Sequence, residues 1–343
     1  MFLMNMFGSN NMNKTKKKGK KKVVVQNQVK NNINPLKDVK IVGYSKIGYG
    51  PKKTECQDSY CITDKLAEDC YFFAVYDGHG SSGKEASQAA NDYIQTYLEK
   101  NQKKFKQLTT DKSRENFLRA AFKSAESKLK SSGIDYSNSG TCCISVFVQK
   151  NMCYIANLGD SRAVLYRTTN KEKLAIELSY DHKPTRPEEK ERIIRAGGKI
   201  EKLMHDGVPV GPYRVWADDE GPGIAMTRTL GDLQAKKIGL ISEPEIQHIE
   251  LTKQDKFIVI GSDGVWDVMQ SAEVVGFVAQ HIQTESQESV PEAIVQECRN
   301  RWDEMNKNKK NSSKIGDLPY LKFGCDDITA VVAFFTFIED DIK

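Results

Sequence analysis

The sequence predicts a layered domain of α-helices and β-sheets, and three observations support this fold class. Short apolar runs rich in β-branched and aromatic residues recur along the chain, and stretches with helical periodicity separate many of them. Two of the runs are also close enough together to form a hairpin. With 343 residues, of which 39% are hydrophobic and 28% charged, the chain can bury one substantial core or two modest ones.

Five apolar runs predict strands. Their nearly continuous hydrophobicity favours sheets that are covered on both faces. The second and third runs are separated only by Gln149-Lys150-Asn151, so at least part of the sheet is expected to be antiparallel. The runs are YFFAVY from Tyr71, CCISVFV from Cys142, MCYIANL from Met152, FIVIG from Phe257 and TAVVAFF from Thr329.

Helical periodicity predicts the elements that cover these sheets. The polar stretch 306–314 is expected to be a surface loop within the domain. The predicted helices are 84–100, 113–131, 187–196, 271–283 and 291–305.

The net charge of +5 is unevenly distributed. The first forty residues hold ten lysines and one acid, so they account for +9 and the rest of the chain carries −4. We expect residues 1–38 to be a basic, Asn- and Lys-rich disordered leader and residues 39–343 to fold. The run KTKKKGKKK from Lys14 suits a solvated leader, a nuclear-import signal, or a weak patch for nucleic acid or anionic lipid, and the sequence leaves these alternatives open.

Features of the sequence predict an intracellular location. No stretch approaches the roughly 20 apolar residues of a membrane helix, and the opening MFLMNMFGSN is too short and lacks the basic segment of a signal peptide. The eight cysteines form no C-x-x-C pair, so we expect reduced thiols. The protein is therefore predicted to be cytoplasmic, nuclear or both, and neither secreted nor transmembrane.

Aspartates follow or precede four of the predicted strands. The run Phe72 to Tyr76 leads directly into Asp77-Gly78-His79-Gly80, and the other aspartates are Asp160, Asp263 and Asp326 with its neighbour Asp327. Buried carboxylates at neighbouring strand ends would repel one another without a cation. Oxygen donors without a histidine or cysteine cluster favour Mg²⁺ or Mn²⁺ over Zn²⁺. Two such ions suit in-line attack on a phosphoryl group.

A competing interpretation is a dinucleotide site. Residues Gly78 to Gly83 also match the G-x-G-x-x-G fingerprint between a strand and a helix. The carboxylate of Asp77 would repel a pyrophosphate there, and the acid about 20 residues further on, Glu99, falls within a predicted helix. The metal site is therefore favoured.

Taken together, the motifs resemble those of the metal-dependent serine/threonine protein phosphatases of type 2C, from about Val42 to Phe335. Nine motifs in the same order make a chance resemblance very improbable. They are KTECQDSY at Lys53, VYDGHGSSG at Val75, SGTC at Ser139, NLGDSRAVL at Asn157, DHKPTRPEEKERIIRAGG at Asp181, AMTRTLGD at Ala225, SEPEI at Ser242, VIGSDGVWDV at Val259 and DDITAVV at Asp326.

This resemblance implies an α+β fold in four layers, an α-β-β-α sandwich of two mostly antiparallel sheets flanked by helices, with 39–343 as the catalytic domain. It implies hydrolysis of phosphoserine and phosphothreonine in proteins by direct in-line attack of a metal-bridging hydroxide, with two Mg²⁺ or Mn²⁺ ions and a weaker third. The implied partners are phosphorylated proteins, and we expect a monomer with no specific site for nucleic acid. A pseudoenzyme that only binds partners and a nicotinamide-dependent reductase are the alternatives.

The resemblance also implies roles for individual residues. Asp58 would orient metal-bound water, His79 would protonate the leaving oxygen, and Lys53 stands where many relatives have a phosphate-binding arginine. The usual acidic residue before Asp58 is replaced by Gln57. The implied metal ligands are Asp77 as the bridge, the carbonyl of Gly78, Asp263 and Asp326, with Asp160 for the third ion.

Other residues of the motifs are expected to have supporting roles. Thr141 and Arg162 are expected to support the sheet core and a loop, and Arg228 and Asp232 suit either the site or a structural turn. The segment 204–216 lies where the family has a variable flap beside the cleft, which we expect to govern substrate choice.

Overall fold

Two antiparallel sheets form the centre of the computed structural model, which describes residues 35–51, 53–67, 69–205, 207–217, 223–311 and 324–339. The predicted leader, residues 1–38, lies almost wholly outside these ranges. The first sheet has six strands, each pairing with its neighbour in antiparallel register. In spatial order they are β11 (Glu245–Glu250), β5 (Met152–Leu158), β4 (Gly140–Gln149), β3 (Cys70–His79) and β2 (Asp58–Ala67), with β10 (Leu230–Gly231) paired to β4.

The second sheet has five strands and is also antiparallel throughout. Its central strand is β12, which pairs with β13 on one side and with β6 on the other. In spatial order the strands are β1 (Leu36–Lys46), β13 (Ile328–Phe337), β12 (Asp255–Gly261), β6 (Arg162–Thr168) and β7 (Lys173–Glu177).

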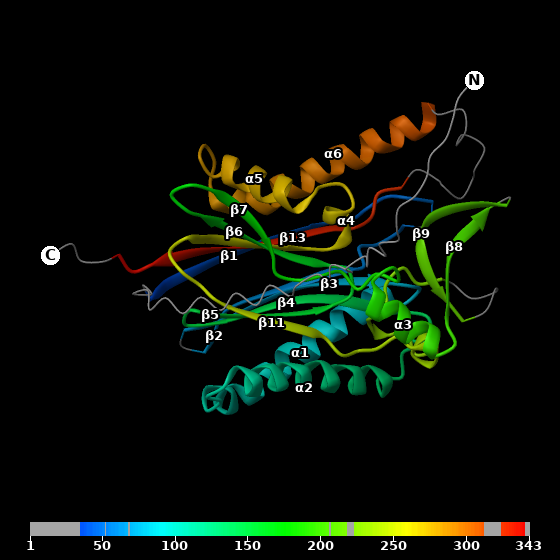
Figure 1. Cartoon of the computed structure of the whole chain (residues 1–343), viewed down its shortest axis with the longest axis horizontal. Coiled ribbons are helices and arrows are strands. Elements are labelled where there is room, and N and C mark those ends of the chain that lie inside the picture. Colours follow the sequence, from blue (N-terminus) through cyan, green and yellow to red (C-terminus); the bar gives the residue numbers. More distant parts are fainter. Residues whose placement is uncertain are drawn as a thin grey trace, which may run out of the picture. The chain divides into compact units, whose positions relative to one another are not determined.

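Helices cover the outer face of each sheet, as Figure 1 shows. Helices α1 (Gly83–Lys106) and α2 (Asp111–Lys130) share one hydrophobic cluster with the six-stranded sheet. Helices α4 (Asp263–Trp266), α5 (Ser271–His281) and α6 (Val290–Asn311) share another with the five-stranded sheet.

A third hydrophobic cluster lies between the sheets, because alternate residues of both sheets point inward. Phe73 and Val75 of β3 meet Ile258 of β12 and Val331 of β13 there, all fully buried. The predicted four-layer α+β sandwich is therefore confirmed, and its two inner layers explain why the predicted strands are apolar on both faces.

The predicted elements mostly coincide with the observed ones. All five apolar runs lie in strands, and the β4–β5 pair is the expected hairpin, with Lys150 at its turn in a left-handed conformation, φ 51°. Helix α3 (Pro187–Arg195) ends one residue before its predicted limit.

One prediction was wrong. The sequence predicts a loop over 306–314, but α6 continues through Asn311, and 312–314 lie outside the described residues. The buried amide of Asn306 explains the extension, because it donates hydrogen bonds to the Tyr49 hydroxyl (2.9 Å) and the Gly324 carbonyl (3.0 Å) and so fixes the polar end of the helix.

The antiparallel pairing also excludes the dinucleotide interpretation. A Rossmann fingerprint requires parallel strands joined by the helix that follows the glycines. Here β3, which leads into the glycines, lies between β2 and β4 and is antiparallel to both. The glycines therefore occupy the turn between β3 and α1 in a different architecture.

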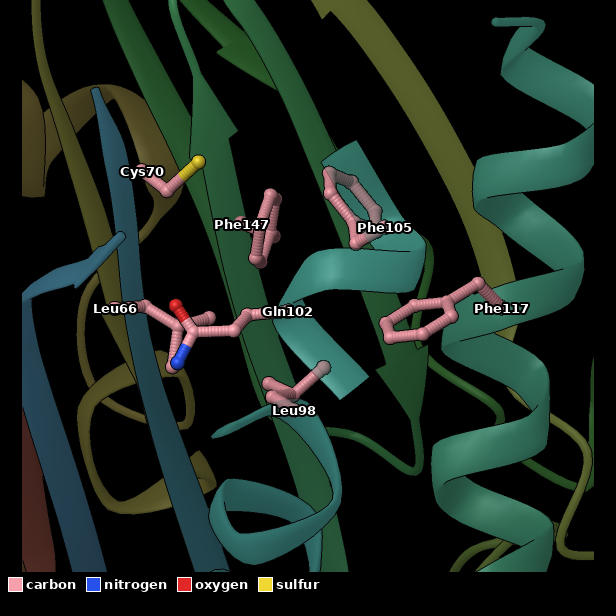
Figure 2. A pocket seen from close by; sticks show the side chains of 7 residues that line it. All are labelled: Leu66, Cys70, Leu98, Gln102, Phe105, Phe117 and Phe147. Atoms are coloured by element: carbon pink, nitrogen blue, oxygen red, sulfur yellow. The ribbon is translucent and has the colours of Figure 1, made fainter. Parts of the chain in front are cut away.

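A small apolar pocket of about 10 Å³ lies where α1 and α2 meet the six-stranded sheet (Figure 2). Phe105 and Phe117 from the helices and Phe147 from β4 line it. A void of this size with few polar partners stays dry. Cys70, which starts β3, also lines the pocket. Asp77 is seven residues further on, about 23 Å along the strand. The pocket is therefore a packing defect remote from the acidic residues.

None of the helices in the described ranges is long and apolar enough to cross a membrane.

Candidate metal centre

The ends of strands from both sheets bring the predicted aspartates together. Asp77 is near the end of β3, where it pairs in register with Asp58 at the start of β2. Asp263 is the first residue of α4, just after β12 ends, and Asp326 precedes β13 by two residues. Asp160 lies in the turn between β5 and β6. The two sheets therefore each supply part of one acidic site.

Three carboxylates form its centre. Side-chain oxygens of Asp77, Asp160 and Asp263 all lie within 4.8 Å of one another. Burial raises the pKa of Asp77 well above its usual value, and the neighbouring charges of Asp263 and Asp58 raise it further. Burial likewise raises the pKa of Asp263, with added repulsion from Asp326 and Asp160. A divalent cation would relieve this repulsion, and a donor set of oxygens alone suits Mg²⁺ or Mn²⁺. The residues therefore fit the expected metal.

Asp326 lies beside these three carboxylates but outside the tight group. Its side chain is 52% exposed, and one of its oxygens accepts a hydrogen bond from the Nζ of Lys53 at 3.3 Å. The same ammonium contacts Asp327 at 2.6 Å. Burial alone would lower the pKa of Lys53, but the charges of Asp326 and Asp327 raise it, so the lysine is firmly cationic.

A second lysine neutralises the other side of the centre. The Nζ of Lys183 donates a hydrogen bond to Asp160, and the thiol of Cys142 donates another to the same carboxylate at 3.2 Å. Burial would raise the pKa of Asp160, but Lys183 holds it below its usual value. Two ammonium groups thus flank the carboxylates and partly compensate their charge.

Asp58 is held by two hydroxyl groups from the other sheet. Its Oδ2 accepts hydrogen bonds from Ser262 at 2.7 Å and from Thr329 at 2.6 Å. Burial, opposed by these hydrogen bonds and reinforced by the charge of Asp327, raises the pKa of Asp58 to about 7. Such a carboxyl is suited to hold and orient a water molecule beside the centre.

Gly78 is a position where a side chain does not fit. A Cβ there would lie 2.2 Å from the Gly83 carbonyl oxygen and 2.5 Å from that of Gln57. The Gln57 carbonyl accepts the Gly78 amide hydrogen (3.2 Å), and the Gln57 side chain donates to the Gly80 carbonyl (2.8 Å). Gln57 therefore fixes the turn after Asp77 through uncharged contacts.

His79 contacts the carboxylate of Asp232, whose sequence motif suited either the site or a structural turn. Its Nε2 lies 2.7 Å from Oδ2 of Asp232, which follows β10 and is fully buried. Burial alone would lower the pKa of His79, but the charge of Asp232 raises it above its ordinary value. Asp232 therefore belongs to the site.

Other motif residues support the surroundings. Thr141 donates to the Asp77 carbonyl (3.0 Å), and Arg162 makes two hydrogen bonds to Asp181 (3.0 and 2.8 Å). Arg228 pairs with the buried Glu189 at 2.7 Å, away from the carboxylate centre, and so has a structural role.

Three residues of the site were not assigned a role there from the sequence: Lys183 was not singled out, Asp327 was named only as the neighbour of Asp326, and Asp232 was left between the site and a structural turn. Asp327 is buried and accepts hydrogen bonds from the backbone amides of Gly48 (2.8 Å) and Gln57 (2.7 Å). All three lie within the motifs that carried the resemblance, in DDITAVV, DHKPTRPEEKERIIRAGG and AMTRTLGD. Their positions in those motifs could have marked them as site residues, but the motifs do not show which side chains they contact.

The predicted flap is a two-stranded hairpin of β8 (Lys199–His205) and β9 (Val208–Trp216). Figure 1 shows it as a unit separate from the two sheets. Four of its apolar side chains are unusually exposed for their type. These are Leu203, Met204, Val208 and Tyr213.

Comparisons with known proteins give a consistent result. The family model described as "Protein phosphatase 2C" matches residues 52–306. "Probable protein phosphatase 2C 35" of Arabidopsis thaliana is 34% identical over 257 residues, covering 69% of this chain and 72% of the relative. "Probable protein phosphatase 2C 34" of the same plant is 34% identical over 283 residues, covering 78% and 73%.

Solved structures share the fold. The crystal structure of a serine-threonine phosphatase 2C from Toxoplasma gondii superposes with a TM-score of 0.70, covering 89% of this chain and 98% of that one at 22% identity. A second phosphatase from a pathogenic strain of Toxoplasma gondii gives a TM-score of 0.63 at 18% identity, covering 90% and 96%.

Proposed function

Because this chain belongs to the protein phosphatase 2C family, we propose that it removes phosphate from phosphoserine and phosphothreonine in proteins at the centre formed by Asp77, Asp160 and Asp263. The family resemblance is confirmed, and with it the class of enzyme, a metal-dependent phosphoprotein phosphatase. The residue specificity, the ions and the order of chemical events are the proposal.

One observation carries the proposal. Three carboxylates with side-chain oxygens within 4.8 Å of one another are a costly arrangement unless a cation binds. We assign two Mg²⁺ or Mn²⁺ ions to Asp77, the Gly78 carbonyl, Asp263 and Asp326, and a weaker third to Asp160. Bound there, the ions would supply Lewis acidity and an activated water for direct in-line attack on phosphorus.

Side chains of the protein would bind the phosphate, orient the attacking water and donate the proton to the leaving oxygen. The ammonium of Lys53, which now contacts Asp326 and Asp327, lies at the rim of the carboxylates and would bind the phosphate oxygens. Asp58, held by Ser262 and Thr329, would orient the attacking water. His79 would give its proton to the seryl or threonyl oxygen as the P–O bond breaks. No cysteine or serine nucleophile is needed, so no phosphoenzyme forms.

The sequence supports a proposal for the setting of this activity. We propose phosphorylated proteins as substrates, selected by the β8–β9 hairpin, and a monomer in the cytoplasm, the nucleus or both. A role for the basic leader in contacting anionic surfaces is part of the same proposal.

A phosphopeptide assay tests the function. The purified protein should release phosphate in Mg²⁺ or Mn²⁺, lose this activity in EDTA, and regain it when either ion is restored. Asp77→Ala and Asp263→Ala should abolish turnover, whereas Asp64→Ala, which changes an exposed aspartate of β2, should not. Full activity of either centre variant would refute the assignment, and binding of partners without any turnover would identify a pseudoenzyme.

A further inference from the structure

The contact between His79 and Asp232 assigns a role to Asp232. We propose that Asp232 is a positioning residue, which fixes the tautomer and the orientation of the His79 ring so that Nδ1 is the nitrogen presented to the substrate. This inference rests on the proposed function, since it takes His79 as the proton donor to the leaving oxygen.

The geometry of the pair is well defined. Nε2 of His79 lies 2.7 Å from Oδ2 of Asp232, the distance of a strong charge-assisted hydrogen bond. The two residues are 153 positions apart, and Asp232 is completely buried. A carboxylate accepts but does not donate, so Nε2 must carry the hydrogen. The neutral ring is therefore held as the Nε2–H tautomer.

The other ring nitrogen is not engaged by Asp232. Nδ1 of His79 is buried and has no hydrogen-bond partner among the residues that the structure describes. When the ring is protonated, Nδ1–H is the only ring N–H not already used by Asp232. As water attacks phosphorus and the P–O bond breaks, the electron pair stays on the leaving oxygen, which takes the Nδ1 proton. The ring is left neutral with its hydrogen on Nε2, the form that Asp232 stabilises.

The backbone holds Asp232 in a conformation that side chains rarely adopt. Its φ is 49°, in the left-handed region. Its amide donates to the Ser139 carbonyl at 2.9 Å, and its own carbonyl accepts the Lys236 amide at 3.1 Å. The preceding residue, Gly231, donates to Oε2 of Glu126 on α2 at 3.0 Å. The backbone that carries this carboxylate is thus held by Ser139, just before β4, and by Glu126 of α2.

The neighbouring strand leaves room for this carboxylate. A Cβ at Gly140, which pairs with Gly231 across β4 and β10, would lie 2.3 Å from Oδ2 of Asp232. That oxygen is the one that contacts His79. The space needed to bring Asp232 against the ring therefore exists only because residue 140 is glycine.

A purely structural role for Asp232 makes different predictions. If the pair only joined the turn after β3 to β10, its loss would lower the rates of hydrolysis of all substrates by the same factor. A positioning role affects only reactions that need a proton on the leaving group. An aryl phosphate such as p-nitrophenyl phosphate has a good leaving group, whereas a phosphoserine peptide does not.

Asp232→Asn separates these possibilities, because asparagine keeps the shape but no longer enforces the tautomer. We expect kcat for the phosphoserine peptide to fall about 100-fold while kcat for p-nitrophenyl phosphate changes less than about threefold. The matched control is Glu126→Gln, which alters the support of the same loop without touching His79 and should change both rates by the same factor. Equal losses on both substrates in Asp232→Asn would overturn the proposal.

A measurement on the unaltered protein does not depend on activity or on the folding of a variant. Nitrogen-15 NMR of histidine-labelled, metal-free protein reports the tautomer of each neutral ring, and His79→Gln assigns the His79 signals. We expect the hydrogen on Nε2. A hydrogen on Nδ1 would refute the positioning role even if the enzyme is active. If instead the pair is present but no phosphatase activity is found, the proposed function fails and the tautomer assignment stands.

Discussion

Asp263→Asn should make the metal-free protein more stable, although it alters the centre of the site. The side-chain oxygens of Asp263, Asp77 and Asp160 lie within 4.8 Å of one another, and two full charges at 4.8 Å repel by about 3.5 kcal/mol at an effective dielectric constant of about 20. Lys183 offsets part of the charge of Asp160, and the raised pKa of Asp263 means that proton uptake relieves more. We therefore expect a net gain of about 1–3 kcal/mol in the free energy of unfolding.

The assay is thermal unfolding in EDTA and in Mn²⁺. A gain of this size raises the melting temperature by a few degrees, at roughly 2–4 °C per kcal/mol for a large domain. In Mn²⁺ the order should reverse, because the wild type gains the binding energy of the ion and the variant loses a ligand. Asp64→Asn, at an exposed position, should behave as wild type in both buffers. If Asp263→Asn is less stable than the wild type in EDTA and is stabilised by Mn²⁺ as much as the wild type is, the reasoning is wrong.

Two further predictions concern charged residues, one in a structural ion pair and one at the rim of the site. Glu189→Gln should cost about 3–5 kcal/mol at pH 7, because the buried carboxylate is bonded to Arg192 (2.6 Å) and Arg228 (2.7 Å), and both guanidinium groups would lose this buried negative charge. Burial alone would raise the pKa of Glu189, but those hydrogen bonds hold it well below its usual value of about 4.3, so this stability is present above about pH 4.3 and is lost as the pH falls. Urea unfolding at pH 7 and pH 3.5 should show the gap between wild type and variant shrinking at the lower pH, and a constant gap would count against it. Lys53→Met should raise KM for a phosphopeptide about tenfold or more with a smaller effect on kcat, because a charged contact to phosphate is lost, and Lys53→Arg should restore binding. Unchanged KM in Lys53→Met, measured by steady-state kinetics, would remove Lys53 from the phosphate site.

The sequence predicted the strands whose burial is reflected in their amino-acid composition. The runs at Tyr71, Cys142, Met152, Phe257 and Thr329 are apolar on both faces because each strand is covered on both sides, and all five lie in strands. Strands with a more mixed composition were not identified. The β8–β9 hairpin is one example, since several of its apolar side chains, such as Met204 and Val208, are exposed and its strands are not continuously apolar.

The site was predictable to a similar extent. Aspartates at strand ends are visible in a sequence, and the structure brings Asp77, Asp160 and Asp263 together. Their partners depend on contacts between distant segments. Asp232 reaches His79 through the pairing of β10, a strand of only two residues, with β4, and no local pattern signals such a short strand.

The position of β13 in its sheet has a consequence for synthesis of the protein. This strand is the last that the structure describes, yet it lies between β1, the first, and β12. A growing chain that has emerged only as far as α6 leaves the facing edges of β1 and β12 unpaired and lacks Asp326. If Asp326 is a metal ligand, as proposed, a nascent chain gains its activity only after this strand is inserted and the whole sandwich forms.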